Sequence, residues 1–595
     1  MELLARTRLT VIGGRFIWAA GGVLLAACGS EAPHPLPDGG PGALADAGVA
    51  GDLDAGPDPS EAMFDPARLL EVDIELLPAD WDALRRQTRD LADTLARPEC
   101  LDAPFPSPFT YFPARVTVDG VAVENSAVRK KGFLGSLSEL KPSLKISFDE
   151  YVPGRELNGV DGLTLNNGRQ DPSLIKACLG YQLFREAGLP ASRCSFAKVT
   201  VNGELLGVFA HVEAIKKRFL RRHFASDEGN LYEGTLSDFR DGWLGTFEQK
   251  TQLEIPSDRS DLLAMTAALQ VSDAELGAAL EPILDVDAFL TFWAAEVLIQ
   301  HWDGYAGNTN NFFLYRDPAT ARLHFLPWGV DGILGARPGA GLPQSVYATG
   351  LLTRRLYLHP ELRARYLARL GALLDSVFDA PAVIDEVDRI EALIVPAVPP
   401  GDRVEVATAI EALRTFLRGR EDALRRELDA GGAAWDVPLR DPPCFRDVGT
   451  LQARLETRWG THPTNNPFNT GTGTLTGTVA GVAIQTLQVG SAAGFGENPD
   501  DAGQAALVLA ATLPGGAIAV VYAVIDPVQF MPGTLLPIDG ERARGVLARI
   551  PRAGAPLELV AYFSQGTVRI DAASLVDGAP VDVTLDAVLW APAGL

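Results

Sequence analysis

Acidic and amide side chains in the middle of the chain have the types and spacing that phosphoryl transfer requires. The segment 301–308 reads His-Trp-Asp-Gly-Tyr-Ala-Gly-Asn, so Asp303 is followed five residues later by Asn308. A carboxylate placed there can accept the proton of a hydroxyl group, and an amide oxygen near it can bind a divalent cation. Asp331 follows an expected strand at 323–326 and is a candidate metal ligand, because hard cations prefer oxygen ligands beside phosphates.

Each of these residues also has a purely structural interpretation. Asp303 and the asparagines could cap and hold loops, because Asn and Asp side chains bond readily to nearby backbone. Asp331 precedes Gly332 and could be a turn residue. We expect His301 to pack inside the protein, since no second His or Cys lies at metal-ligand spacing from it. The residue types alone therefore leave both roles open.

The lysines are confined to one part of the chain. All nine lie between residues 130 and 250, whereas arginine supplies positive charge elsewhere. A compact ammonium suits a phosphate where a planar guanidinium fits poorly, so this distribution favours a phosphate-binding region. Chance, or a solvated basic face that includes Lys145, explains the distribution equally well.

An α+β arrangement is expected to position these residues. Asp119-Gly120 and Asn202-Gly203 each separate two strand-like runs and predict tight hairpins. Asp171 should cap a helix that ends at Gly188, and an amphipathic helix is expected at 287–300. Further strands are predicted at 70–76 and 141–148, and further helices at 78–89 and throughout 354–428. Strands first and helices afterwards suggest a two-lobed domain, which we place at 63–460.

The C-terminal part predicts a separate all-β, sandwich-like domain. A stretch rich in Thr, Asn and Gly at 461–478 is typical of a linker. Beyond it, at 479–595, β-rich runs alternate with Gly and Pro turns. A chain of 595 residues also exceeds what one hydrophobic core usually supports, so more than one domain is expected.

The N-terminus predicts export. Residues 1–27 have a cationic start and an apolar run of 12 residues, which is too short to span a bilayer as a helix. The tetrad ending in Cys28 resembles the bacterial lipobox, which implies cleavage before Cys28 and acylation of its thiol. Gly29 is not the Asp that often signals inner-membrane retention, so we expect a lipid anchor in the outer membrane or at the cell surface. Residues 28–62 then form a flexible acidic tether rich in Gly, Pro and Ala. An ordinary signal peptide with an incidental cysteine is the alternative.

Exported proteins can keep disulfides, and four cysteines remain after Cys28. Three pairings are possible. We favour Cys178–Cys194, because a helix followed by a short return to a strand could bring them together, which leaves Cys100–Cys444. Four free buried thiols are the alternative.

Charge excludes one class of partner. The chain has 52 Lys and Arg against 76 Asp and Glu, a net charge of -24. Such a surface repels a phosphate backbone, so nucleic acid is not an expected partner. The composition, 47% hydrophobic and 22% charged, is that of a globular protein rather than a multispan membrane protein.

The order and spacing of several short motifs between roughly residues 70 and 430 resemble the CotH-type (spore-coat protein H) kinase family. Each motif is weak alone, but their combination is specific. They are Lys131-Gly132-Phe133-Leu134-Gly135-Ser136, Lys141-Pro142-Ser143-Leu144-Lys145-Ile146, Leu165-Asn166-Asn167, Asn202-Gly203-Glu204, Gly207-Val208-Phe209 leading to Glu213, Asn230-Leu231-Tyr232-Glu233, Trp302-Asp303-Gly304-Tyr305, the run Asn308 to Asn311, and Pro327-Trp328-Gly329-Val330-Asp331.

This resemblance implies an atypical protein-kinase-like fold that transfers the γ-phosphoryl group of ATP to Ser or Thr hydroxyls with Mg²⁺ or Mn²⁺. The turn 132–136 is expected to cover the nucleotide. Gly329 departs from the Pro-Trp-Asp-x-Asp pattern of many members, so one carboxylate is missing and metal affinity should be reduced. The implied roles are catalysis for Asp303, metal binding for Asp331 with Asn308 or Asn311, and cofactor binding for Lys141 or Lys145 and for Glu213.

Two functions follow from these observations. The first is a lipid-anchored kinase-like phosphotransferase of the cell envelope, acting on a surface or coat protein. ATP is scarce outside the cytoplasm, so the second is a catalytically weak or inactive surface or coat protein that uses the kinase-like domain for binding.

Overall fold

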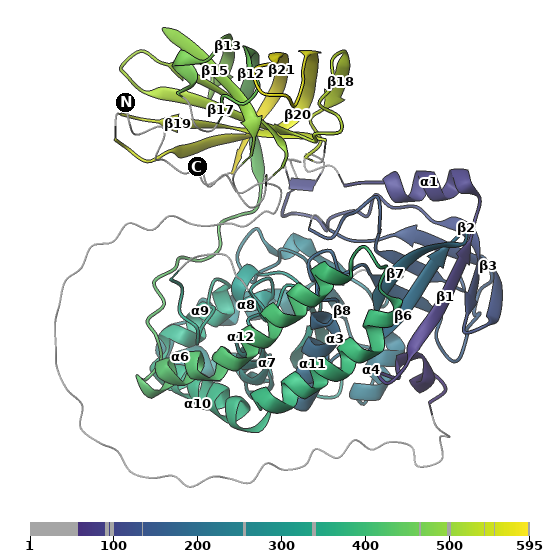
Figure 1. The fold of residues 1–595 in the computed structure, drawn as a ribbon. Coiled ribbons are helices and arrows are strands. Elements are labelled where there is room, and N and C mark those ends of the chain that lie inside the picture. Colours follow the sequence, from purple (N-terminus) through teal and green to yellow (C-terminus); the bar gives the residue numbers. More distant parts are fainter. Residues whose placement is uncertain are drawn as a thin grey trace. The chain divides into compact units, whose positions relative to one another are not determined.

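A computed structural model describes residues 58–592 except 90–93, 96–99, 134, 254–256, 336–340, 463–465, 497–500, 502, 541 and 553. The predicted signal peptide, Cys28 and most of the predicted tether lie outside these residues. The described chain forms two compact units (Figure 1). The first ends at Arg440, and the second begins at Asp441 and also includes the described residues between Thr88 and Leu101.

The first unit starts with a closed seven-stranded barrel in the order β1-β2-β3-β4-β5-β7-β6. Neighbouring strands are antiparallel except β1 and β6, which are parallel. Both predicted hairpins form, at Asp119-Gly120 and Asn202-Gly203, and all four residues have the positive φ that such turns require. The strands are β1 (Leu69–Glu75), β2 (Phe112–Val118), β3 (Val121–Lys130), β4 (Leu144–Ser147), β5 (Gly162–Asn166), β6 (Cys194–Val201) and β7 (Glu204–Val212), and the helix α1 (Pro78–Arg86) follows β1.

Strand alternation gives the barrel one polar outer face on β3, β4 and β5. Val128, Leu144, Ile146, Leu163 and Leu165 belong to the buried interior. The residues between them therefore point outward, because successive side chains on a strand alternate. The ladder pairs Lys145 with Arg129 on one side and with Thr164 on the other, so these outward side chains form one row.

The rest of the first unit consists of helices around a four-stranded sheet of order β11-β10-β8-β9. A helix, α7, forms close to the predicted range 287–300, but all of Phe289–Leu298 is buried. The predicted helix is therefore present, and its predicted amphipathic pattern was wrong. It packs against α10 at the centre of a large hydrophobic core. The strands are β8 (Leu231–Gly234), β9 (Phe247–Gln249), β10 (Phe312–Arg316) and β11 (Leu323–Pro327), and the helices are α3 (Lys176–Glu186), α4 (Lys217–His223), α5 (Ser260–Ala268), α6 (Asp273–Leu280), α7 (Val286–Leu298), α8 (Tyr305–Asn308), α9 (Leu351–Leu358), α10 (Pro360–Ser376), α11 (Ala380–Ile394) and α12 (Arg403–Asp429).

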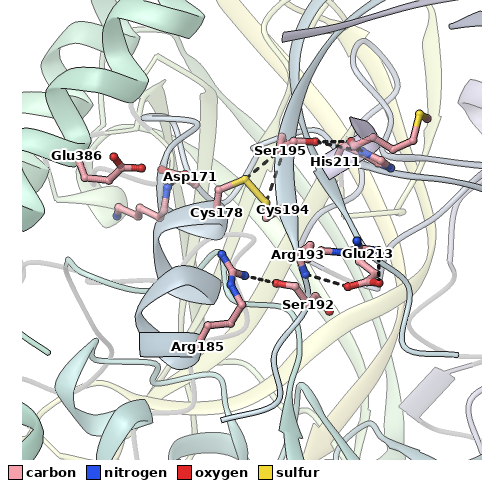
Figure 2. Close-up of a disulfide and its surroundings, with 12 residues drawn as sticks. Asp171, Cys178, Arg185, Ser192, Arg193, Cys194, Ser195, His211, Glu213 and Glu386 are labelled. Carbon is pink, nitrogen blue, oxygen red and sulfur yellow. Dashed lines mark hydrogen bonds and ion pairs between the residues drawn. A yellow bond between two sulfur atoms is a disulfide. The ribbon is translucent and has the colours of Figure 1, made fainter. Parts of the chain in front are cut away.

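Helix α3 starts later than its predicted cap. Asp171 accepts hydrogen bonds from the backbone N–H groups of Ser173 and Lys176, at 3.0 and 2.7 Å, and so holds a turn ahead of the helix. A disulfide between Cys178 and Cys194 joins α3 to β6, which is the pairing favoured from the sequence (Figure 2).

The second unit is all-β and starts before the predicted linker. Strand β12 (Phe445–Arg458) pairs with β13 and β21, so part of the predicted 63–460 domain belongs to this sheet. The predicted linker at 461–478 overlaps β13, because its Thr and Gly residues pair with β12. The ten strands form one sheet. This sheet curves strongly, so that Trp459 forms a bridge with Ala493, and the curved sheet stands where a sandwich-like arrangement was predicted. The other strands are β13 (Thr472–Val479), β14 (Val482–Ala483), β15 (Gln488–Phe495), β16 (Ala505–Thr512), β17 (Ile518–Ile525), β18 (Thr534–Pro537), β19 (Ala543–Ile550), β20 (Glu558–Ala572) and β21 (Pro580–Pro592).

Cys100 and Cys444 form the second disulfide, within this unit. Among the described residues, no helix has both the length and the apolar character needed to cross a membrane.

Candidate active site

A buried glutamate on the preceding helix holds the loop that carries Asp303. Glu296 on α7 is fully buried and accepts hydrogen bonds from the backbone N–H groups of Tyr305 and Ala306, both at 2.9 Å. Burial raises the pKa of Glu296 to about 8, although these two hydrogen bonds oppose the shift. Tyr305 in turn donates its hydroxyl to Asp238 at 3.0 Å. These hydrogen bonds therefore fix the position of the first residues of α8, which follow Asp303 in the chain.

Asp303 is surrounded by three side-chain amides. Asn308 donates to Asp303 Oδ1 at 2.5 Å, Asn310 to the same oxygen at 3.3 Å, and Asn311 to Oδ2 at 2.8 Å. Burial raises the pKa of Asp303, whereas these amides and the charge of Arg440 lower it. The amides orient both carboxylate oxygens and stabilise the ionised form, which a proton acceptor needs.

Several residues around this loop have left-handed backbone conformations. Gln300, Thr309, Asn311 and Leu334 have φ values of 55°, 49°, 52° and 46°. A non-glycine residue in this region costs energy and persists only where the surroundings require it. The loop is therefore a preorganised structure whose geometry the packing of the lobe enforces.

The ladder between β10 and β11 brings Asp331 beside this loop. Phe312 pairs with Pro327, and the N–H of Trp328 donates to the backbone oxygen of Asn311 at 3.2 Å. Burial and the charges of Asp303 and Asp171 together raise the pKa of Asp331 to about 6, although the charge of Lys131 opposes the shift. Such a concentration of carboxylates favours a bound cation.

Asn311, rather than Asn308, has an amide oxygen available for such a cation. Asn308 Oδ1 accepts a hydrogen bond from Arg440 Nε at 2.6 Å, and its Nδ2 is used by Asp303. Asn311 Oδ1 has no donor within hydrogen-bond distance in the described part of the chain and faces Gly329, two residues from Asp331. The described residues contain no group of three or more His, Cys, Asp or Glu arranged to hold a metal. A divalent cation held by Asp331 and Asn311 would therefore take its remaining ligands from phosphate oxygens and water.

Lys131 supplies a positive charge that the motif analysis left without a role. Its ammonium donates to Asn166 Oδ1 at the end of β5. Burial lowers the pKa of Lys131 to about 8, while the charges of Asp331 and Glu233 raise it. Asn166 and Asp331 line a small cavity of about 10 Å³, so Lys131, Asn166 and Asp331 lie together.

A large cleft of about 840 Å³ begins on the same face of β5. Thr164 and Lys145 line it, and Asn166, two residues beyond Thr164, lines the small cavity. Two residues along a strand span about 7 Å, so the cleft and the carboxylates are neighbours. Burial and the nearby cations Arg129, Lys216 and Lys250 together lower the pKa of Lys145 to about 8, although the charge of Glu233 opposes the shift.

Lys145 differs from the other cations of the cleft because it lacks a counter-ion. The others each form an ion pair of 3.0 Å or less: Lys216 with Asp161, Lys217 with Glu228, Arg218 with Glu156, Arg221 with Asp227, and Lys250 with Glu233. In the described residues, no acceptor lies within hydrogen-bond distance of Lys145. Its ammonium is therefore the group in this cleft that an anionic ligand can reach without breaking an existing pair.

Two residues of the predicted cofactor set, Lys141 and Glu213, are already bound by other groups of the protein. Lys141 donates to the backbone oxygen of Val208 at 2.8 Å and stands over the ring of Phe209, so it is used in holding the barrel. Glu213 borders the cleft, but both of its oxygens accept hydrogen bonds from Arg193 and Arg222 (Figure 2 shows the pair with Arg193). These contacts hold the pKa of Glu213 below its ordinary value, although burial opposes them. Leu134, in the turn expected over the nucleotide, lies outside the described residues.

Four contributors to the site were missed from the sequence. Glu296 is a lone acid in an apolar helix, a pattern that could have marked it as a buried contact. Lys131 and Glu233 stand in motifs that were recognised without roles being given to them. Arg440 carried no sequence signal.

The comparisons with known proteins identify the family of this part of the chain. Residues 128–424 match the family CotH kinase protein, and this part of the chain therefore belongs to the CotH kinase family. The first unit is thus a kinase-like protein domain, and the second unit is a separate all-β sheet.

Two curated relatives match over parts of their length. Inner spore coat protein H of Bacillus subtilis (strain 168) is 26% identical over 254 residues, which cover 40% of this chain and 68% of that protein. Invasin CotH7 of Rhizopus delemar is 23% identical over 231 residues, 35% of this chain and 38% of the invasin. Among solved structures, the Helicobacter pylori proinflammatory kinase CtkA is 12% identical with a TM-score of 0.28, covering 51% of this chain and 95% of CtkA.

Proposed function

We propose that this protein is an atypical Ser/Thr protein kinase that transfers the γ-phosphoryl group of ATP to a surface or coat protein. One observation carries the proposal: the amide-held Asp303 lies close enough to Asp331 for its charge to raise the pKa of that carboxyl, and Asp331 shares a small cavity with Asn166. Asn166 is two residues along β5 from Thr164, which lines the cleft where Lys145 is the cation without an ion pair among the described residues. A candidate proton acceptor, a candidate metal ligand and a candidate phosphate contact thus lie in one region of the first unit.

The residues can perform the transfer as follows. Lys145 and Lys131 bind phosphate oxygens and place the nucleotide along the polar face of β5. Asp303 orients the acceptor hydroxyl and takes its proton as the oxygen–phosphorus bond forms and ADP leaves. Asp331 and Asn311 would hold Mg²⁺ or Mn²⁺, which supplies charge stabilisation for the phosphates when bound. The buried Glu296 keeps the Asp303 loop fixed during the reaction.

The test is phosphate incorporation from labelled ATP by the full-length protein in detergent, with Mg²⁺ or Mn²⁺. Autophosphorylation is the practical assay until an acceptor is found, and phosphoamino-acid analysis identifies the modified hydroxyl. Asp303→Asn is the matched inactive variant, and exposed Asp287→Asn on the same lobe is the control. Absence of metal-dependent nucleotide binding and of incorporation in the wild type would refute the proposal.

We also propose that the protein is an exported lipoprotein of the cell envelope, anchored through Cys28. The lipobox-like tetrad supports this, as do two disulfides, which persist mainly in oxidising compartments. The matched Bacillus protein is named for the inner spore coat and the matched Rhizopus protein is named an invasin, which fits a coat or surface location. Metabolic labelling with a fatty-acid probe should mark the wild type, and equal labelling of Cys28→Ala contradicts the anchor.

A second candidate function has one observation in its favour. Position 329 is a glycine, so the site has one carboxylate fewer than the Pro-Trp-Asp-x-Asp pattern. A kinase-like coat protein that binds a nucleotide or a partner without turnover predicts binding in calorimetry and no incorporation. The two functions are therefore separated by the same pair of measurements.

A further inference from the structure

The segment that follows α12 returns along α9 towards the candidate active site. Arg354 donates to the backbone oxygens of Trp435 and Val437, at 3.0 and 2.7 Å. The Trp435 side chain is buried and donates to the backbone oxygen of Ala348 at 3.1 Å. We call residues 430–440 the C-terminal strap. Its course is fixed by contacts that are independent of the site itself.

The strap ends in a contact with the Asp303 loop. The N–H of Arg440 donates to the backbone oxygen of Thr349 at 2.9 Å. Thr349 donates through both its N–H and its hydroxyl to the backbone oxygen of Ala306, each at 3.0 Å. The Arg440 side chain then extends to Asn308 Oδ1, with Nε at 2.6 Å. Arg440 therefore contacts α8 directly through its side chain and indirectly, through Thr349, by its backbone.

Arg440 and Asp303 together fix the orientation of the Asn308 amide, one at each end of the side chain. An asparagine side chain has a donor end and an acceptor end of nearly equal size, whereas an arginine has donors only. Because Arg440 takes Oδ1, Asn308 must direct Nδ2 towards Asp303, to which it donates at 2.5 Å. The reverse orientation would place the amide oxygen against the carboxylate, which is repulsive.

We propose that Arg440 is a positioning residue for Asp303, delivered by a strap that lies outside the family segment 128–424. The inference rests on the proposed function and extends it: the family segment alone lacks the donor that holds the amide oxygen of its Asn308. A competent catalytic loop in this protein requires the chain to continue to residue 440. The same contact lets the strap control turnover without touching the nucleotide.

The experiment compares Arg440→Ala and Arg440→Lys with the wild type in the full-length protein. Steady-state phosphate incorporation gives kcat and the KM for ATP. Hydrogen exchange of the amides in 303–311, measured without nucleotide, reports the loop directly. Arg418→Ala is the matched control, because Arg418 is exposed and pairs with Glu411 on the outer side of α12.

We expect Arg440→Ala to lower kcat about tenfold or more while the KM for ATP changes less than about twofold. Exchange in 303–311 should accelerate, and exchange in the strap around Trp435 should not, because Arg354 still holds it. Arg440→Lys should recover most of kcat, since it keeps a donor for Asn308. Arg418→Ala should match the wild type in every measurement.

Unchanged kcat and unchanged loop exchange in Arg440→Ala would overturn the inference. So would a variant that loses strap protection and melts early without recovery in Arg440→Lys, because that pattern indicates a role in folding. If the wild type itself shows no incorporation, the proposed function fails, and loop exchange in the two variants still decides the role of Arg440.

Discussion

The side chain of Asn311 occupies the space that a side chain at position 329 would need. A Cβ placed on Gly329 would lie 2.5 Å from Asn311 Oδ1, and Gly329 has a φ of +56°. Asn311 simultaneously donates to Asp303 Oδ2 at 2.8 Å. The glycine that departs from the Pro-Trp-Asp-x-Asp pattern therefore contacts the amide that orients the carboxylate of Asp303.

Restoring the acid by Gly329→Asp should destabilise the protein instead of strengthening metal binding. The left-handed backbone costs about 1–2 kcal/mol for a residue with a Cβ, and the contact with Asn311 adds to that cost. We expect a lower melting temperature and a displaced Asn311. Differential scanning calorimetry without Mn²⁺ measures the loss of stability, and the shift in melting temperature on adding Mn²⁺ measures metal binding.

Gly203→Asp is the control for backbone strain alone. Gly203 has a φ of +82° and nothing within 4 Å of its Cβ position, so it should lose clearly less stability than Gly329→Asp. A Gly329→Asp variant that melts like the wild type and binds Mn²⁺ more tightly would contradict the steric argument.

The sequence was sufficient for the acidic centre because the residues concerned are close along the chain. Asp303, Asn308 and Asn311 lie on one loop, and β10 and β11 form a hairpin that returns Asp331 to it. Local spacing therefore determined their convergence. The choice between Lys141 and Lys145 needed the register of β3, β4 and β5, which motif spacing does not reveal.

The alternating pattern of residues 451–458 could have shown where the second unit starts, but the Thr- and Gly-rich stretch after it was interpreted as a linker. Residues 451–458 alternate between buried and exposed, as a half-buried strand does. The pairing of the Thr and Gly residues of β13 with this strand depends on a distant partner, β21, on its other side. Such long-range pairing is absent from local composition.

Lys145→Met should weaken ATP binding about tenfold or more, a change of about 1.4 kcal/mol. Among the described cations of the cleft, Lys145 is the one without an ion pair, so a phosphate can bind its ammonium without displacing a carboxylate. Lys217→Met is the control, because Lys217 lines the same cleft but is paired with Glu228 at 2.9 Å. Calorimetry with Mg²⁺ and ATP measures both, and equal losses would contradict this assignment.

The affinity of the wild type for ATP should fall as the pH rises above about 8. Burial and neighbouring cations lower the pKa of Lys145 to about 8, so the amine becomes neutral above that pH and no longer attracts phosphate. Lys145→Arg keeps its charge and should flatten most of this dependence. Titrations between pH 7 and 9.5 distinguish the two, and identical slopes would assign the dependence to another group.

Glu296 predicts a pH dependence of stability with the opposite sign to that of most carboxylates. Its pKa of about 8 in the folded protein is above the ordinary value, so folding takes up a proton between about pH 4.5 and 8. Stability from this group is present below that window and is lost as the pH rises through it. The melting temperature of the wild type minus that of Glu296→Gln should therefore decrease from pH 5 to pH 8. Exposed Glu281→Gln is the control and should give a flat difference curve.

The Cys178–Cys194 bridge should matter for both stability and the site. It closes a loop with a sequence separation of 16, for which chain entropy gives about 3 kcal/mol. Helix α3 packs directly on the Asp331 segment, since a Cβ on Gly180 would lie 2.6 Å from Ile333 Cδ1. The double variant Cys178→Ser, Cys194→Ser should unfold at lower denaturant concentration and bind ATP with Mg²⁺ more weakly. Loss of stability with unchanged ATP affinity would show that α3 keeps its place without the bridge.

Asp303→Asn should separate catalysis from binding. The substitution keeps the size of the side chain but removes the charge and one acceptor oxygen, so it can no longer take a proton from the acceptor hydroxyl. We expect kcat for phosphate incorporation to fall about 100-fold or more, with ATP affinity nearly unchanged, because Asp303 is needed mainly in the transition state. The variant also places an amide among the amides of Asn308, Asn310 and Asn311, so a modest fall in melting temperature is expected. A purely structural role predicts the reverse, a large fall in stability with unchanged turnover per folded molecule, and labelled ATP combined with calorimetry on the same samples distinguishes the two.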